Sequence, residues 1–256
     1  MEVVICPDEQ QVGAVAADRV IAQLSGKQTP VLGLATGSSP LNLYEELQRR
    51  AEAGDVDFSH ALGFALDEYV GLDPEHPLSY RQTILRTVVR PLGMNPDRVR
   101  VPNGFAADLQ EAAEEYERAI REAGGVDVQI LGIGTNGHIG FNEPTSSFSS
   151  RTRIKTLTQQ TREDNARFFS DDETVPTHCV TQGLGTIMDA HNVVMVATGE
   201  KKADVVAAMI EGPVSAMCPA SLLQFHRHAF VIIDEAAAAH LQYADYFRHV
   251  AANQPA

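Results

Sequence analysis

Several short segments of this chain are apolar along nearly their whole length, and most are followed by a stretch with helical periodicity. The segments cover residues 3–6, 31–35, 62–66, 127–131, 192–197 and 229–234. Strands that are apolar on both faces occur in parallel sheets that helices cover on both sides. The sequence therefore predicts an α/β fold with a mostly parallel sheet.

Helical patterns occupy the stretches between these segments. Asp8 is a candidate N-cap for the first helix and Gly26 a candidate stop, while Pro40 falls in the first turn of the second helix. Further helices are predicted over residues 79–90 and 107–125. No repeat, low-complexity tract or linker-like change of composition interrupts the pattern, which predicts a single α/β domain over residues 1–256.

Polar residues follow four of the predicted strands, at the point where each strand ends. These stretches are TGSSP at 36–40, DEY at 67–69, GTNGHIGFNEP at 134–144 and TGEKK at 198–202. In open parallel sheets, ligands bind outside the carboxyl ends of the strands. We therefore expect these four loops to carry the function.

The charge balance excludes some classes of partner. Acidic residues outnumber basic ones by 34 to 20, for a net charge of -14. This disfavours binding to nucleic acid or to an anionic membrane, although a local group of cations could still bind a small anion. The sequence shows no signal-peptide pattern and no apolar run of membrane-spanning length. Together with three cysteines that are expected to be reduced, this predicts a cytoplasmic protein.

The cysteines and most of the histidines receive no chemical role. Three cysteines without metal-type spacing predict reduced, structural thiols and no metal site. Five scattered histidines are likewise interpreted as structural. These residues are Cys6, Cys179, Cys218, His178, His191, His226, His228 and His240.

Gly132, Gly134 and Gly137 form a literal G-x-G-x-x-G after a predicted strand. A dinucleotide-binding fingerprint needs a helix that begins inside the glycine run and an acidic residue about 20 positions later. Here Pro144 follows closely, and the later region reads RIKTLTQQ, without an acidic residue. We therefore reject a dinucleotide cofactor. The glycines more simply allow a tight turn and a close approach to the backbone.

Six motifs occur in an order that resembles the glucosamine-6-phosphate deaminase family. They are LGLATGSSP, FALDEYVGL, LGIGTNGHIGFNEP, SSRTRIKTL, NARFF and VATGEKKA. The resemblance implies a Rossmann-like three-layer α/β sandwich without a cofactor. It also implies a step of amino-sugar catabolism, in which glucosamine 6-phosphate and water give fructose 6-phosphate and ammonia.

The resemblance assigns catalytic roles to four positions. Asp67 matches the base that moves a proton between C2 and C1 of the open-chain sugar, and the neighbouring Glu68 is interpreted as structural. His138 matches the residue that opens the sugar ring, with Glu143 as its carboxylate partner. Asn136 stands where many members carry Asp, so this position lacks the usual charge. We expect a hydrogen bond to be enough to fix the tautomer of His138.

The phosphate of the substrate is expected at the TGSSP loop. The family pattern implies binding by Thr36, Gly37, Ser38 and Ser39, together with the N-terminus of the following helix. It adds two cations, Arg167 in NARFF and Lys202 in TGEKKA, which would explain how an acidic protein binds an anion. Lys202 is preferred to Lys201 because it fits the G-x-x-K-A register. The polar segment 158–176, which contains Arg167, is a candidate for a covering segment.

A possible effector site is also implied by the family. Regulated members bind N-acetylglucosamine 6-phosphate between subunits, through positions that match Ser146, Arg153 and Lys155. Such a site would require a homo-oligomer and two global states. The alternative is that Arg153 and Lys155 are solvated charges on an edge strand. We favour an unregulated enzyme.

Two rival functions remain open from the sequence. A 6-phosphogluconolactonase has a similar fold and a similar glycine–histidine loop. DEY at 67–69 and FNEP at 141–144 argue against that hydrolase. The other rival is a domain that senses a sugar phosphate without turnover, which Asn136 would permit.

Overall fold

The core of the chain is a parallel sheet. A computed structural model describes residues 1–166, 169–170 and 173–253, and within them seven strands form this sheet. Every neighbouring pair runs parallel, as the apolar segments predicted. In spatial order the strands are β1 (Glu2–Cys6), β10 (Ala229–Asp234), β9 (Asn192–Ala197), β6 (Val128–Leu131), β2 (Val31–Leu34), β3 (Leu62–Ala65) and β5 (Val99–Arg100).

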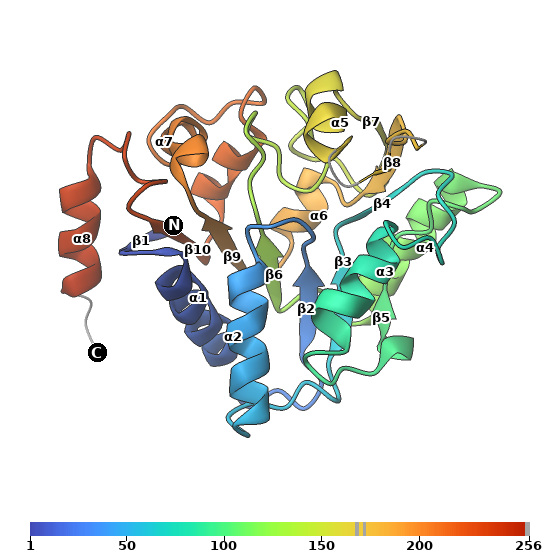
Figure 1. The fold of residues 1–256 in the computed structure, drawn as a ribbon, viewed down its shortest axis with the longest axis horizontal. Coiled ribbons are helices and arrows are strands. Elements are labelled where there is room, and N and C mark those ends of the chain that lie inside the picture. The colour runs from blue at the N-terminus through green and yellow to red at the C-terminus, as the bar shows by residue number, and fades with distance from the viewer. Residues whose placement is uncertain (167–168, 171–172, 254–256) are drawn as a thin grey trace.

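Helices cover the sheet on both sides (Figure 1). In that view α1, α2 and α3 lie in front of the sheet, and α4 and α6 lie behind it. Right-handed crossovers produce this division, because the chain first moves along the sheet from β1 to β5 and then returns from β6 to β10. The three-layer sandwich is confirmed. The helices are α1 (Glu9–Leu24), α2 (Leu41–Glu52), α3 (Tyr80–Ile84), α4 (Leu109–Glu122), α5 (Gln159–Ala166), α6 (Leu184–Met188), α7 (Ala203–Ile210) and α8 (Ala244–Ala252), with short 3-10 turns at Pro96–Arg98, Glu200–Lys202 and Pro219–Phe225.

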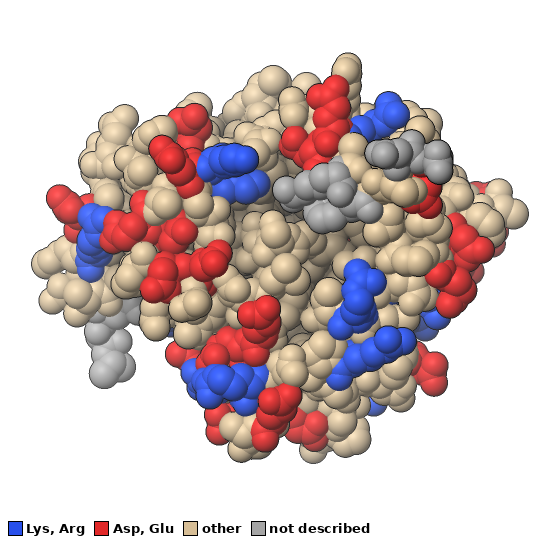
Figure 2. Space-filling model, viewed as in Figure 1, with Lys and Arg blue, Asp and Glu red and all other residues tan. Residues whose placement is uncertain are grey.

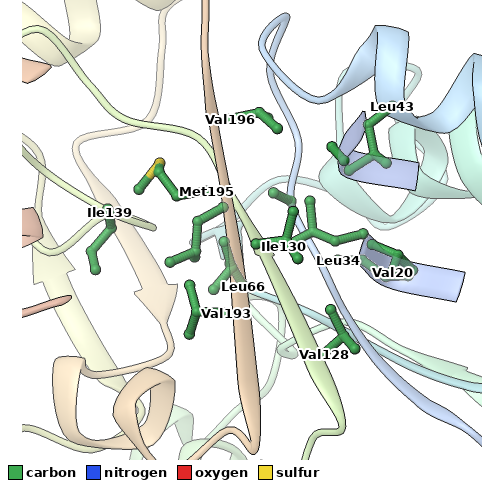
Figure 3. Packing of buried hydrophobic residues seen from close by; sticks show 14 of the residues in the cluster. Val20, Leu34, Leu43, Leu66, Val128, Ile130, Ile139, Val193, Met195 and Val196 are labelled. Carbon is green, nitrogen blue, oxygen red and sulfur yellow. The ribbon is translucent and has the colours of Figure 1, made fainter. Parts of the chain in front are cut away.

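The central strands are buried on both faces. Every residue of β2 and of β6 is buried, and so are the last five of β9. Figure 3 shows Val128 and Ile130 of β6 on the same side of the sheet as Val20 on α1 and Leu43 on α2, and Val193 of β9 on the opposite side, with Met195. Strands of this kind have no solvated face, which explains their near-continuous apolar sequence.

A second, smaller sheet was not expected. It is antiparallel, with the order β4 (Asp67–Tyr69), β8 (His178–Thr181) and β7 (Arg153–Thr156). The prediction that residues 67–69 form a loop is therefore wrong. The chain changes sheets at Leu66, whose N–H donates to Leu34 O at 3.0 Å and whose carbonyl accepts from Gln182 N at 2.7 Å. A three-residue strand with two acidic residues has too little apolar pattern to be recognised.

The predicted N-cap at Asp8 agrees with the structure, whereas the predicted helix over residues 79–90 differs from it in the interior. Asp8 caps α1 by accepting from Gln11 N at 2.8 Å, as predicted. Pro40 is the N-cap of α2 and does not lie in its first turn. The predicted helix over 79–90 is not uniform, because α3 continues into a π-helical turn at Leu85–Val89. Such turns leave no mark on a hydrophobic pattern of period 3.6.

Basic side chains do not form a large patch on the face shown in Figure 2, where they lie in small groups among acidic ones. The described helices include none whose length and apolar character would let it cross a membrane. Among the same residues, His, Cys, Asp and Glu side chains nowhere gather in threes in a way that could hold a metal ion.

The pair Gly33 and Gln129 lies at the centre of the sheet, where β2 and β6 meet in register. Gln129 is fully buried, and its side chain occupies the space beside Gly33. A Cβ at Gly33 would lie 2.1 Å from Gln129 Oε1. The absent side chain of one strand therefore makes room for the polar side chain of the next.

Gly33→Ala should destabilise the protein by about 1–3 kcal/mol, because the new methyl group overpacks this contact. Gln129→Ala should be destabilising on its own because it leaves a cavity. The double variant should be more stable than the sum of the two losses predicts, because the methyl group then enters the vacated space. Urea unfolding of the four proteins measures this coupling, and additive losses would contradict the packing described.

Candidate active site

A cavity of about 640 Å³ opens at the carboxyl ends of β2, β3, β6 and β9. The hollow lies near the centre of the face shown in Figure 2. The cavity takes lining residues from all four predicted loops. β2 and β6 are neighbours although the chain leaves them in opposite directions along the sheet, so the cavity lies at a topological switch point. The cavity therefore lies where the sequence predicts the functional loops, at the carboxyl ends of the strands.

The glycine run after β6 shapes a loop, and no helix begins between β6 and β7, a stretch the structure describes completely. Gly137 has a positive φ of 86°. Gly134 makes room for the His138 ring, because a Cβ there would lie 2.1 Å from His138 Cε1. The expectation that no helix begins inside the glycine run is confirmed. These glycines place an imidazole at the cavity wall.

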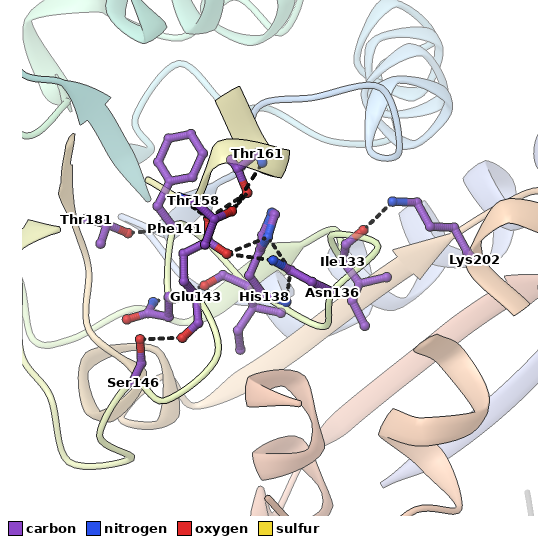
Figure 4. Close-up of polar contacts among 12 residues, drawn as sticks. Ile133, Asn136, His138, Phe141, Glu143, Ser146, Thr158, Thr161, Thr181 and Lys202 are labelled. Carbon is purple, nitrogen blue, oxygen red and sulfur yellow. Dashed lines mark hydrogen bonds and ion pairs between the residues drawn. The ribbon is translucent and has the colours of Figure 1, made fainter. Parts of the chain in front are cut away.

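His138, Asn136 and Glu143 form one hydrogen-bonded chain (Figure 4). His138 Nδ1 lies 2.7 Å from Asn136 Oδ1, and Asn136 Nδ2 donates to Glu143 Oε2 at 2.7 Å. The direct distance from His138 Nδ1 to Glu143 Oε2 is 3.6 Å. The amide of Asn136 therefore lies between the imidazole and the carboxylate.

This order fixes the tautomer of His138. The ionised carboxylate of Glu143 can only accept, so it must face the NH₂ group of Asn136. The amide oxygen of Asn136 then faces the ring and can only accept, so Nδ1 of His138 carries a proton. In the neutral imidazole, Nε2 is left with a lone pair that can accept a proton.

Glu143 is buried, and its pKa responds to two opposed effects. Burial raises the pKa, but the nearby His138 ring and the hydrogen bonds from Thr161 and Asn136 outweigh burial and lower the pKa to about 2. Thr161 Oγ1 donates to Glu143 Oε1 at 2.6 Å, and Thr158 contributes its N–H at 3.3 Å. The carboxylate is therefore ionised throughout the neutral range.

Asp67 is a second buried carboxyl group, and unlike Glu143 it lines the cavity. Burial and the nearby charge of Glu68 raise its pKa to about 8, against a smaller lowering by the Phe141 N–H. Glu68 points to the other side of the strand, where its carboxylate accepts from the N–H groups of Tyr80 and Arg81 at the start of α3. The two adjacent acids thus have different environments, and Glu68 holds a helix end.

The residues expected to bind phosphate line the same cavity. Thr36, Gly37, Ser38 and Ser39 all lie on its wall, directly before α2. The N-terminus of α2 has no side-chain cap. The Leu41 N–H donates to Ser38 O at 3.3 Å, and the N–H groups that follow it are left for another partner. Lys202 also lines the cavity, and its Nζ donates to Ile133 O at 2.6 Å. Arg167 lies outside the described residues.

The three positions matched to an effector site lie outside the cavity lining. Ser146 is only 2% exposed, and its hydroxyl donates to Glu143 O at 2.7 Å. Arg153 is half-buried, and its Nη1 donates to Asn142 Oδ1 at 2.9 Å. Lys155, on β7, is also half-buried.

Several residues around the site were not identified from the sequence. Thr158 and Thr161 bind Glu143 although they follow it by 15 and 18 residues. Thr181 accepts from Phe141 N at 3.1 Å and pairs with Asp67 across the small sheet. Thr145 has a φ of 74°, which is strained for a β-branched residue. Only the spacing of Thr158 before a helical stretch, as a possible N-cap, could have suggested one of them.

Comparisons with known proteins agree with this geometry. The sequence profile described as glucosamine-6-phosphate isomerases/6-phosphogluconolactonase matches residues 7–232. A glucosamine-6-phosphate deaminase of Cutibacterium acnes is 60% identical, over 97% of this chain and 95% of its own length. One of Arthrobacter sp. is 57% identical, over 100% of this chain and 98% of its own.

Solved structures show the same fold. A monomeric glucosamine-6-phosphate deaminase superposes with a TM-score of 0.90 at 38% identity, covering 94% of this chain and all of the other. A 6-phosphogluconolactonase of Leishmania guyanensis has a TM-score of 0.73 at 21% identity, with 93% and 97% coverage. The match over most of its length and the close relatives place this chain in the glucosamine-6-phosphate isomerase/6-phosphogluconolactonase family.

Proposed function

We propose that this protein is a glucosamine-6-phosphate deaminase, which converts glucosamine 6-phosphate and water to fructose 6-phosphate and ammonia. One observation carries the proposal. A buried carboxyl group with a raised pKa, Asp67, shares a cavity with an imidazole whose Nε2 is a proton acceptor, His138. Relatives at 55–60% identity that bear this name support it.

His138 opens the sugar ring. In the closed pyranose, the hydroxyl at C1 must lose a proton and the ring oxygen must gain one. Nε2 of His138 accepts the first proton and then donates it to the ring oxygen, which leaves an aldehyde at C1. During this transfer the imidazole is briefly charged. Glu143 stabilises that charge from 3.6 Å, while Asn136 holds the ring in place.

Asp67 moves the proton that converts the aldose to the ketose. As the carboxylate, it removes the proton from C2 and returns it to C1. The ammonium group on C2 gives one proton to the C1 oxygen, so that C1 becomes CH₂OH and the C2–N bond becomes an iminium bond. Water then adds to C2, and ammonia leaves to give the ketone. The ammonium group on C2 of the substrate lowers the pKa of Asp67, because a nearby positive charge favours the carboxylate. Substrate binding thereby prepares the base.

The phosphate is bound at the end of the cavity formed by residues 36–39. Backbone and hydroxyl donors of this loop act with the uncapped N-terminus of α2. Lys202 supplies a positive charge on the same wall. Arg167 is proposed as a second cation on the strength of the NARFF motif alone.

The direct test is ammonia release. Purified protein with glucosamine 6-phosphate should release ammonia and form fructose 6-phosphate in equal amounts. With 6-phosphogluconolactone, the same protein should not raise the rate of hydrolysis. Lactone hydrolysis without ammonia release would identify a lactonase, and binding without either reaction would identify a sensor.

Asp67→Asn should lower turnover at least about 100-fold, because the amide cannot act as a base. It should also raise the melting temperature at pH 7. Asp67 holds its proton more tightly in the folded than in the unfolded protein, so folding loses stability as pH rises from about 4 towards 8. The difference in melting temperature between Asp67→Asn and the wild type should become smaller near pH 4. Thermal melts of both proteins at pH 4.5 and 7.5 measure it, and an active variant would exclude Asp67 as the base.

Asn136→Asp should remain active with an altered pH profile. The new carboxylate would lie beside both His138 Nδ1 and Glu143, where its negative charge favours the charged over the neutral imidazole. The imidazole must be neutral to accept a proton, so the rising limb of kcat/KM should move to higher pH. An unchanged profile would show that this position does not affect the charge of His138.

A further inference from the structure

The catalytic carboxylate of Glu143 is held from two sides by different parts of the chain. Oε2 accepts from Asn136 Nδ2 and faces His138. Oε1 faces the start of α5, where it accepts from Thr161 Oγ1. Glu143 as a whole is only 2% exposed, so water cannot replace a partner that its carboxylate loses. Each oxygen therefore depends on its own set of donors.

Thr161 makes the shortest of the contacts to Oε1. Its hydroxyl lies 2.6 Å from that oxygen, and its side chain is buried. Thr158 Oγ1 lies 3.2 Å from Glu143 Oε1 and 3.0 Å from Thr161 Oγ1, so its single proton must serve one or the other. A hydrogen bond to an ionised group is worth more than one between neutral groups. Thr161 is therefore the main anchor of Oε1.

We propose that Thr161 is a positioning residue for ring opening: its hydroxyl holds Glu143 Oε1 so that Oε2 stays aimed at Asn136 and His138. The inference rests on the proposed role of His138. If Oε1 is released, the carboxylate can rotate about its last bond and Oε2 leaves the Asn136 NH₂ group. The amide is then no longer fixed, and neither is the tautomer of the imidazole.

The chain offers a matched control for the loss of a threonine hydroxyl. Thr186 Oγ1 donates to Glu117 Oε1 at 2.5 Å, and both side chains are buried. Neither residue lines the cavity. Thr186→Val therefore removes the same kind of hydrogen bond from a buried glutamate outside the site. It changes the shape of the side chain in the same way as Thr161→Val does.

The first measurement is the tautomer of His138, read from ¹⁵N spectra of the histidine side chains without substrate. The His138 signals are assigned by their absence in His138→Gln. The wild type should show a proton on Nδ1. Thr161→Val should show a mixture of the two tautomers, whereas Thr161→Ser and Thr186→Val should keep the wild-type spectrum. A wild-type spectrum in Thr161→Val would overturn the proposal.

The second measurement is steady-state kinetics. Thr161→Val should lower kcat about tenfold with little change in KM, and Thr161→Ser should restore kcat to within about twofold of the wild type. A change in KM alone would show a substrate contact and overturn the positioning role. Should Thr161→Val fail to fold by circular dichroism, Thr161→Ala takes its place in both measurements. The ¹⁵N spectra report the tautomer of His138 without any turnover. If the wild-type protein released no ammonia, the proposed function would be refuted, and the spectra would still test the positioning role of Thr161.

Discussion

Burial of the central strands on both faces is the constraint on which the rest of the structure depends. β2, β6 and β9 have no solvated face, so side chains that act on a ligand must stand where these strands end. Adjacent parallel strands end at one edge of the sheet, which gathers four loops from distant parts of the sequence around one cavity. The contact between Gly33 and Gln129 belongs to the same arrangement, because the Gln129 side chain fills the space beside Gly33 where β2 and β6 pair.

Two buried carboxyl groups have different roles in the proposed reaction because their surroundings differ: Asp67 transfers a proton, and Glu143 remains charged. Asp67 lies beside another acid with few donors, and its pKa is raised to about 8. Glu143 is surrounded by donors that lower its pKa to about 2. The raised pKa suits Asp67, which must take and return a proton. The lowered pKa suits Glu143, which must keep its negative charge. Burial alone would have raised the pKa of both, so hydrogen bonding decides the difference.

Much of the layered fold could be predicted from the sequence, because parallel strands carry a continuous apolar pattern and loops carry glycine and proline. The placement of Asp67, His138 and Lys202 around one cavity followed from the rule for strand ends, and their proposed roles came from the family resemblance. The small antiparallel sheet could not be predicted, since β4 is three residues long and pairs with β8, more than 100 positions later. Thr161 was also missed, because a threonine near the start of a helix is an ordinary capping residue and only the folded chain brings it to Glu143.

The connection between β7 and β8 has a consequence for how such proteins diversify. These strands are antiparallel neighbours, and Thr156 lies opposite His178, so the segment between them begins and ends at almost the same place. A segment with adjacent ends can change in length or sequence at little cost to the framework that carries it. This segment includes α5, which contributes Thr161, Asp164 and Asn165 to the cavity wall. Exchange of this one segment between relatives would therefore alter the ligand pocket while leaving both sheets as they are.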